Sequence, residues 1–272
     1  MLAIFSKDKH ILLLLQSIMV KAKKHLGQHF LIDDSISFNI ANALKNTENY
    51  THVVEVGPGT GALTKHLLNN DGYTTVAAEI DRDSVAYLNQ HYPKLQVLQE
   101  SFLSLDFDTI AEGNVAVVGN FPYNISTQIL FKVLEEKHRV PEVVGMFQKE
   151  VAERVAEKPG SKKYGILSVL LQAYYDIEYL FTVDAEAFNP PPKVQSGVIR
   201  LVRNNVEKLD CDEKRFKQVI KTSFNQRRKM LRSSLKPLLS DELKASELFT
   251  KRPEQLSVQD FINITNMIFK EE

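Results

Sequence analysis

The sequence is poor in the residues that several classes of protein need. Its single cysteine, Cys211, excludes an internal disulfide and favours a reducing, cytoplasmic location. Acidic and basic residues balance at 34 each, so the formal net charge is zero and no global field attracts nucleic acid. Any basic surface must therefore be local. No cysteine–histidine cluster has metal-ligand spacing, so we expect no metal site.

A hydrophobic run long enough to span a bilayer is also missing. The apolar run at residues 11–15 is too short, and no small-residue cleavage site follows it. Met19 offers a second start, so we interpret residues 1–18 as either a mis-called upstream extension or a disordered arm, and assign them no function. The remainder, in a chain that is 43% hydrophobic and 25% charged, fits a globular protein with one large domain and one small one. We expect a monomer that does not associate with a membrane.

Short apolar segments alternate with helical patterns along much of the chain. Strands are expected at residues 52–56, 74–78, 96–99, 115–118 and 143–147. Helices are expected at residues 33–44, 62–68 and 127–134. Two more strands, 179–183 and 198–202, follow near the end of this region. The alternation predicts an α/β fold, with a Rossmann-like, mainly parallel sheet flanked by helices on both faces.

The pattern becomes helical after Asn204. Apolar residues between Phe216 and Phe224 recur at helical spacing and form one stripe. A short helix is expected from Asp241, and a last one over residues 258–269. We therefore predict a Rossmann-like domain over residues 19–203 and a small all-α domain over residues 204–272.

The first strand ends in a glycine-rich turn, residues 57–61, that suits a nucleoside ligand. Glycines such as Gly57 allow a sharp turn and a close approach to a ligand, and nucleotides bind at this turn in doubly wound sheets. The spacing differs from the dinucleotide fingerprint, and Pro58 lacks an amide that could grip a pyrophosphate. S-adenosylmethionine is therefore the candidate cofactor. Glu79, at the end of the next strand, is expected to accept the ribose hydroxyls rather than to be a surface acid. Asp81 is expected to cap the following helix.

A second loop has the groups needed to hold an exocyclic amine. The strand at 115–118 is followed by Asn120-Phe121-Pro122-Tyr123. Asn120 supplies a side-chain oxygen, Phe121 a backbone carbonyl, and Tyr123 an aromatic face that can stack on a base. We predict that the two oxygens accept the hydrogens of an adenine amine. The alternative for Tyr123 is a core aromatic.

Six ordered segments resemble the rRNA adenine dimethyltransferases. They read KKHLGQHFL at 23–31, EVGPGTGALT at 55–64, NFPYNIS at 120–126, SKKYGILSV at 161–169, FNPPPKVQS at 188–196 and FNQRRK at 224–229. The resemblance implies an S-adenosylmethionine-dependent enzyme that dimethylates N6 of two adjacent adenosines near the 3′ end of 16S rRNA, within a 30S precursor. The alternatives are an adenine methyltransferase that acts on 23S rRNA or DNA, and a ribosome-assembly factor that mainly binds.

The resemblance also assigns contacts to single residues. It implies that His29 and Leu31 touch the cofactor, and that Asn120 lies beside the methionine end of the cofactor. It implies that Phe188 covers the face of the target base opposite Tyr123. Taken alone, Phe188 is more typical of a core aromatic.

At one position the sequence departs from the family pattern. Ser101 occupies the place of the aspartate that usually contacts the cofactor adenine, and Glu100 precedes it. Strand alternation would point these two side chains to opposite faces, so one of them is expected to serve. We favour Ser101 and expect somewhat weaker cofactor binding.

A basic segment predicts RNA binding. From Lys214 to Ser240 the chain has nine lysines and arginines and no acid. A charge run is usually a solvated helix face, but this one has a single sign in a neutral protein. We interpret it as a phosphate-binding surface. Its main candidates are Lys221, Arg227, Arg228, Lys229 and Arg232, and Lys21, Lys23 and Lys24 are expected to add to it. Such contacts position RNA without reading its sequence, so specificity is expected to come from RNA shape.

Overall fold

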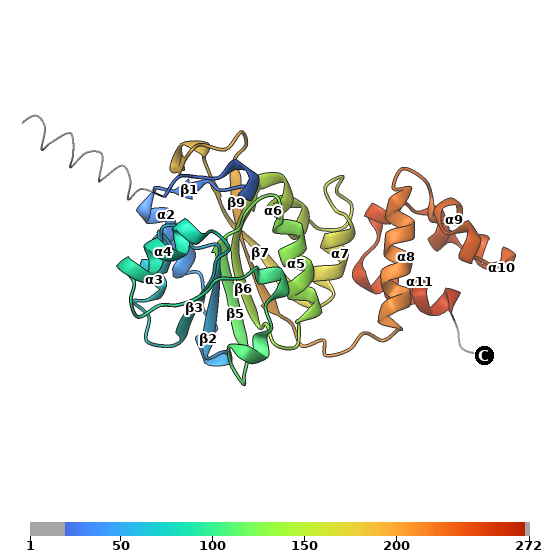
Figure 1. Cartoon of the computed structure of the whole chain (residues 1–272). Helices are drawn as coiled ribbons and strands as arrows, with labels where there is room; N and C mark the ends of the chain where they lie inside the picture. Colours follow the sequence, from blue (N-terminus) through green and yellow to red (C-terminus); the bar gives the residue numbers. More distant parts are fainter. Residues whose placement is uncertain (1–19, 270–272) are drawn as a thin grey trace, which may run out of the picture.

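The computed structural model describes residues 20–269, so the expected extension at 1–18 lies outside the described residues. An α/β part and a helical part lie side by side (Figure 1). The α/β part contains a seven-stranded sheet of order β4-β3-β2-β5-β6-β9-β7. Its strands are β2 (His52–Val56), β3 (Thr74–Ala78), β4 (Gln96–Leu98), β5 (Val115–Asn120), β6 (Glu142–Gln148), β7 (Tyr175–Val183) and β9 (Ser196–Arg203).

The sheet confirms the predicted α/β class. Strands β4, β3, β2, β5 and β6 run parallel, whereas β9 is antiparallel to both of its neighbours. Each expected strand is present, although β5, β6, β7 and β9 extend beyond their expected ranges. A separate two-stranded sheet was not expected. It pairs β1 (Phe30–Leu31) with β8 (Phe188–Asn189) and so joins segments far apart in the sequence.

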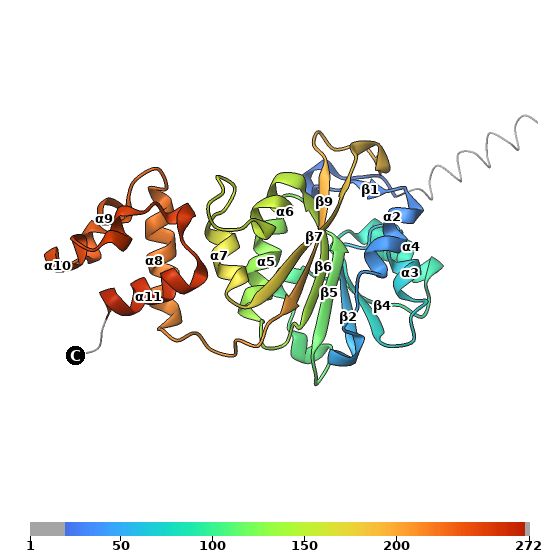
Figure 2. The ribbon, with the colours of Figure 1, turned by 180° about the vertical axis from the view of Figure 1, so that it is seen from behind.

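Helices cover both faces of the sheet (Figures 1 and 2). They are α2 (Asp34–Ala41), α3 (Thr64–Leu67), α4 (Arg82–His91), α5 (Ser126–Glu135), α6 (Lys149–Ala156) and α7 (Ile166–Gln172). The alternation of strand side chains explains the two layers, because Val54 packs in the cluster that holds α5, α6 and α7, and Val53 in the cluster that holds α2 and α3. Helix α4 begins as predicted, since the Asp81 side chain accepts a hydrogen bond from the Asp83 amide at 3.2 Å.

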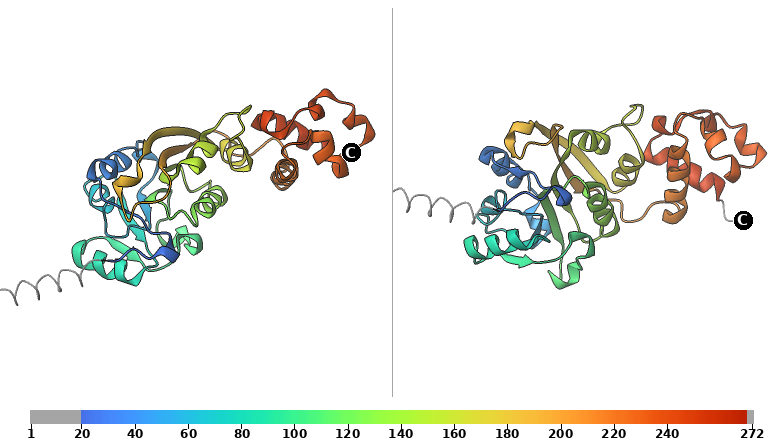
Figure 3. Two further views of the ribbon diagram at one scale, coloured as in Figure 1. Left: turned by 90° about the horizontal axis from the view of Figure 1, so that it is seen from above. Right: turned by 45° about the horizontal axis from the view of Figure 1, so that its top comes forward.

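The helical part packs directly against the α/β part. Its helices are α8 (Glu213–Asn225), α9 (Leu231–Ser234), α10 (Asp241–Lys244) and α11 (Val258–Ile268). The predicted apolar stripe of α8 is buried in the same hydrophobic cluster as α7, and the rings of Tyr164 and Phe224 meet at 6.4 Å. Figure 3 shows this part beside α7. The boundary proposed at residue 204 therefore separates two kinds of secondary structure that share one core.

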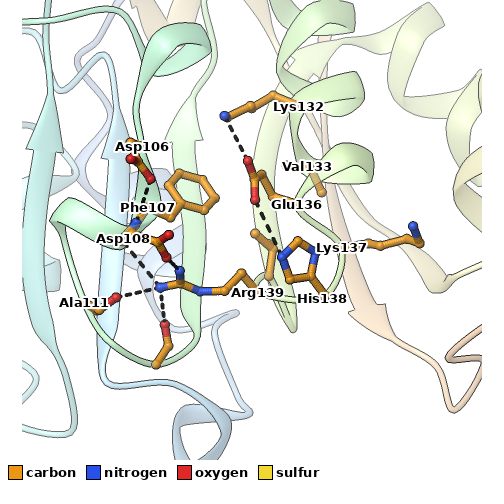
Figure 4. A network of polar contacts seen from close by, with 12 residues as sticks. Asp106, Phe107, Asp108, Ala111, Lys132, Val133, Glu136, Lys137, His138 and Arg139 are labelled. Atoms are coloured by element: carbon orange, nitrogen blue, oxygen red, sulfur yellow. Dashed lines mark hydrogen bonds and ion pairs between the residues drawn. The ribbon is translucent and has the colours of Figure 1, made fainter.

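Arg139 ties together the loops at the amino ends of the parallel strands, away from their carboxyl ends. The Arg139 guanidinium pairs with Asp108 and donates to the carbonyl oxygens of Ala111 at 2.6 Å and Gly113 at 2.7 Å (Figure 4). The Arg139 carbonyl accepts from the Val115 amide at 2.9 Å. The loop before β5 and the turn before β6 are thereby tied together. None of the helices in residues 20–269 is long and apolar enough to cross a membrane.

The carboxyl end of β5 is held by a ring packed on two glycines. Phe121 is 1% exposed, meets Phe147 edge-on at 5.0 Å and lies over Gly119 and Gly145. A Cβ at Gly145 would lie 2.2 Å from the Phe121 ring, and one at Gly119 would lie 2.9 Å from it. Glycine is needed in these strands because the ring takes the space of a side chain.

Alanine at Gly145 should therefore displace the Phe121 ring and with it the loop at residues 120–123. We expect Gly145→Ala to lower the free energy of unfolding by about 1–3 kcal/mol through overpacking. The matched control is Gly113→Ala, because a Cβ at Gly113 would meet nothing within 4 Å. Thermal melts followed by circular dichroism check this. Equal stability of the two variants would contradict the packing argument.

Candidate active site

The glycine turn and the loop at Asn120 face each other across one cavity. The strand order reverses between β2 and β5, which is where ligands bind in doubly wound sheets. A Cβ on Gly57 would lie 3.5 Å from the Pro122 ring, so the two loops are in close reach. The cavity is open to solvent and comprises about 1090 Å³ of space at the carboxyl ends of β2 to β5. It is lined by residues from all of these ends and from the N-terminal segment at 26–31.

The glycine turn has the conformation that a close ligand approach requires. Gly57 and Gly59 have φ angles of 65° and 58°, in the left-handed region that favours glycine. A Cβ on Gly59 would lie 2.8 Å from the Phe30 ring. Both glycines line the cavity, so the backbone itself forms this wall.

Glu79 is a buried carboxylate at the cavity wall. It is 5% exposed, and its two oxygens accept hydrogen bonds from the amides of Gly59 at 3.2 Å and Asp81 at 2.9 Å. Burial raises the pKa of Glu79 from its usual value. Each carboxylate oxygen has a second lone pair, so acceptor capacity remains for ribose hydroxyls. The alternative of a surface acid is excluded by this burial.

Asn120 has a fixed side-chain orientation. It is the last residue of β5, and its Nδ2 donates to the His29 carbonyl oxygen at 2.9 Å. His29 is held in turn, because its Nδ1 lies 2.8 Å from the Pro190 carbonyl oxygen. With the amide nitrogen engaged, the Asn120 side-chain oxygen remains as an acceptor at the cavity.

Tyr123 also lines the cavity and is held on two sides. Its ring stacks on that of His29 with centroids 5.5 Å apart, and its hydroxyl lies 2.5 Å from Ser196 Oγ. Burial raises the pKa of the Tyr123 phenol, so it is neutral near pH 7. Tyr123 is only partly buried, unlike the core residue Phe121, whose contribution to the cavity is its backbone.

One of the predicted contacts, that of Phe188, differs from its expectation, whereas Leu31 lines the cavity as predicted. Phe188 is 2% exposed, belongs to the hydrophobic core and does not line the cavity in the described residues, whereas its strand partner Leu31 does. Phe188 is therefore a core aromatic residue and not a residue that faces the target base. The pairing of β8 with β1 buries its ring. Leu31 is 6% exposed and reaches the cavity from the same small sheet.

Glu100 and Ser101 do not lie in a strand, so strand alternation does not decide which of them faces the cavity. Strand β4 ends at Leu98, and both side chains line the cavity from the loop that follows. Ser101 caps the next turn by accepting from the Leu103 amide at 3.2 Å. Its hydroxyl hydrogen stays available for a ligand, and Glu100 is exposed beside it. Either residue can therefore reach a ligand adenine.

The predicted basic surface is exposed. Lys221 lies on α8, and Arg227, Arg228, Lys229 and Arg232 lie on or before α9. Within residues 20–269, no ion pair involves these five side chains. Arg227 donates to the Lys162 carbonyl oxygen and so connects the surface to the α/β part. Their charges are therefore available to phosphates.

Lys23 was expected to add to the basic surface, but its charge is paired with two carboxylates. Its ammonium pairs with Asp81 and lies 2.8 Å from an Asp83 carboxylate oxygen. Gln28 Nε2 adds a bond to Asp81 at 3.2 Å. Two carboxylates at the start of α4 thus neutralise Lys23, and the residue anchors the N-terminal segment at the cavity.

Sequence reasoning missed Glu55 as a cavity residue. Glu55 is 2% exposed, lines the cavity and accepts a hydrogen bond from Thr64 Oγ1 at 2.6 Å. Desolvation raises the pKa of Glu55 to about 8. Its place on β2, two residues before Gly57, was the available signal, because strand ends at a glycine turn face the ligand crevice. The described residues contain no cluster of metal-binding side chains.

These features define a class. A positive-φ glycine turn, a buried carboxylate with spare acceptors and an aimed Asn-x-Pro-Tyr loop form a site with the shape and donor set for S-adenosylmethionine beside an adenine. The protein is an S-adenosylmethionine-dependent methyltransferase. The family profile described as ribosomal RNA adenine dimethylase matches residues 19–270. The chain belongs to this family, and its substrate is rRNA.

Curated relatives agree along nearly their whole length. The chain is 55% identical over 252 residues to the ribosomal RNA small subunit methyltransferase A of Cytophaga hutchinsonii, covering 92% of this chain and 98% of the relative. It is 56% identical over 253 residues to the protein of that name from Flavobacterium johnsoniae, covering 92% and 96%. The predicted enzyme class and cofactor are thereby confirmed.

Solved structures support the fold. A dimethyladenosine transferase from Plasmodium falciparum superposes with a TM-score of 0.73 at 22% identity, covering 87% of this chain and 96% of that one. The 23S rRNA methyltransferase ErmE superposes with a TM-score of 0.64 at 24% identity, covering 87% and 99%. At such identities the likeness concerns the fold.

The raised pKa of Glu55 predicts a pH-dependent stability. The folded state holds the Glu55 proton up to about pH 8, whereas the ordinary value is 4.5. The proton on Glu55 stabilises the fold fully at a pH below the pKa of Glu55 in the unfolded chain. This stabilisation is lost as the pH rises through the higher pKa of Glu55 in the folded protein. Wild type should therefore lose stability relative to Glu55→Gln between these values, by up to about 1.4 kcal/mol per pH unit. Melting temperatures of both proteins from pH 5 to pH 9 check this. Parallel curves would show that Glu55 is ionised in the fold.

Proposed function

We propose that the protein dimethylates N6 of two adjacent adenosines near the 3′ end of 16S rRNA, in a 30S precursor, as a cytoplasmic monomer. The names of the relatives at 50–56% identity support the small subunit as substrate. The observation that carries the chemistry is the bond from Asn120 Nδ2 to the His29 carbonyl oxygen. It leaves the Asn120 oxygen to accept a hydrogen from the adenine amine.

The adenine amine is a poor nucleophile because its lone pair is delocalised into the ring. In the proposed mechanism the Asn120 side-chain oxygen and the Phe121 carbonyl oxygen accept its two hydrogens. These bonds favour a pyramidal nitrogen and release the lone pair. Oxygens that are already aimed cost no reorganisation during the reaction. One N–H remains after the first transfer, so the same acceptors can hold the monomethylated amine for the second.

Tyr123 fixes the plane of the target base. Stacking on an aromatic ring stabilises a base by about 1–3 kcal/mol and directs N6 toward the cofactor. One face of the ring is occupied by His29, so the base uses the other. The adenosine has to leave its stack to enter the cavity. Positioning is therefore the main contribution of this loop to the rate.

The residues of the other half of the cavity would hold the cofactor. Gly57 and the turn around it would contact the nucleoside, Glu79 would accept the ribose hydroxyls, and Ser101 or Glu100 would bond to the adenine. His29 and Leu31 close the methionine side together with Asn120. When bound, the cofactor supplies a methyl group on a sulfonium, which is an electrophilic carbon. Glu79 supports this role because it lines the cavity and can accept hydrogen bonds beyond those from the Gly59 and Asp81 amides.

Alanine at Asn120 tests the catalytic role. We expect Asn120→Ala to lower kcat by about 100- to 1,000-fold, the effect of removing one aimed hydrogen-bonding group, while RNA binding is kept. The matched control is Asn114→Ala, because the Asn114 side chain bonds to the Asn49 carbonyl oxygen at the opposite end of β5. Single-turnover methyl transfer to unmethylated 30S particles measures both. A native rate in Asn120→Ala would exclude this role.

The substrate is tested by mapping the methyl groups. The purified protein is incubated with tritiated cofactor and either unmethylated 30S particles, 23S rRNA or duplex DNA, and the products are mapped by mass. We expect four methyl groups, two on each of two adjacent adenosines of 16S rRNA. Preferred methylation of 23S rRNA or DNA, or stable 30S binding without transfer, would contradict the proposal.

The basic surface predicts a salt-dependent affinity. Replacing Arg228 and Lys229 by alanine removes two charges that have no ion-pair partner in residues 20–269. Because each phosphate contact releases about one counterion, the slope of log affinity against log salt should fall by about 2. Lys94→Ala, an exposed lysine after α4, is the control. Filter binding of 16S rRNA at several salt concentrations measures the slope. An unchanged slope would remove these residues from the interface.

A further inference from the structure

The hydroxyl of Tyr123 ends at a buried serine on another strand. Ser196 opens β9, is 0% exposed, and its Oγ lies 2.5 Å from the Tyr123 hydroxyl oxygen. In the register of the sheet Ser196 stands between Gln148 of β6 and Val183 of β7. A residue paired on both sides cannot shift along the sheet, so its hydroxyl is a fixed point.

Two contacts together determine where the Tyr123 ring lies. The hydrogen bond to Ser196 fixes the far end of the ring and hence its direction from the backbone. Rotation about the long axis of the ring leaves that bond intact, so a second contact is needed to set the ring plane. Stacking on His29, at 28° between the planes, supplies it. His29 is itself held by the Pro190 carbonyl oxygen, and Ser126 Oγ donates to the Tyr123 carbonyl oxygen at 3.1 Å.

A phenylalanine in place of Tyr123 would offer the same stacking area. The hydroxyl is therefore not needed for stacking on a base, and its partner is a side chain that is fully buried. A polar pair in this setting is stabilising only while both hydroxyls bond to each other. The pair therefore holds the ring in one place, but a substitution at either residue leaves the other hydroxyl buried without its partner.

We propose that Ser196 is a positioning residue for methyl transfer, acting through the Tyr123 hydroxyl to hold the stacking ring in register with Asn120. The inference rests on the proposed role of Tyr123 as the platform for the target adenine. Reacting atoms must meet within a few tenths of an ångström, and a misplacement of about 1 Å can lower a rate by about 100-fold. Ser196 is not among the residues that line the cavity in the described part of the chain, so it acts through Tyr123 and not by contact with a ligand.

A double-mutant cycle tests the proposal. Ser196→Ala and Tyr123→Phe each remove the same hydrogen bond and keep the ring. We expect each to lower kcat about 10-fold, with the dissociation constant of the cofactor unchanged, and the double variant to be no slower than either. Ser223→Ala is the control, because Ser223 is also 0% exposed and its hydroxyl donates one hydrogen bond, to the Val219 carbonyl oxygen at 2.7 Å, away from the cavity. It should match Ser196→Ala in melting temperature and keep the native kcat.

The outcomes separate this inference from the proposed function. A native kcat in Ser196→Ala overturns it. So does a further loss when Ser196→Ala is added to Tyr123→Phe, since Ser196 would then act by another route. If Ser196→Ala does not fold, Tyr123→Phe decides, because it removes the bond from the loop side, and a native kcat there overturns the inference. Tyr123→Ala tests the platform itself. A native kcat in that variant would refute the stacking role in the proposed function.

Discussion

The hydrogen bond between Asn120 and the His29 carbonyl oxygen is the contact on which the site depends. It joins the carboxyl end of β5 to the N-terminal segment at residues 23–31, which is not part of the seven-stranded sheet. The bond orients the amide, and His29 also supports Tyr123 through ring stacking. Lys23 and Gln28 hold the same segment against α4 through Asp81. The segment at 23–31 thus acts as a support for both halves of the cavity.

The rest of the fold keeps this junction rigid. The Phe121 ring fills the space over Gly119 and Gly145 and so fixes the position of the loop at residues 120–123 relative to the sheet. The Phe121 ring is buried in the core, whereas Tyr123 lines the cavity, and Phe121 carries the carbonyl oxygen that we propose as an acceptor. The Arg139 contacts act at the opposite edge of the sheet, where loops can be tied without reaching the site (Figure 4).

Local patterns predicted much of this architecture. The strands β2 and β3 have the expected bounds, since buried parallel strands appear as continuous apolar runs. Helices α6 and α7 were missed, because α6 follows β6 without a turn signal and α7 is apolar on nearly every side. The assumption of strand alternation at Glu100 and Ser101 was wrong because β4 ends earlier. The pairing of β1 with β8, which buries Phe188, is a contact between residues about 160 positions apart that periodicity cannot reveal.

The sequence by itself determined the class of fold, the family and the two loops that meet at the cavity, because strand runs, glycine turns and the Asn-x-Pro-Tyr loop are local patterns. Tertiary structure decided which side chains face the cavity. It fixed the Asn120 amide through a carbonyl oxygen 91 residues away, buried Glu55 enough to raise its pKa, and brought the Ser196 hydroxyl to that of Tyr123. Orientation, burial and partnership depend on residues distant in the chain, so they exist only once the chain has folded.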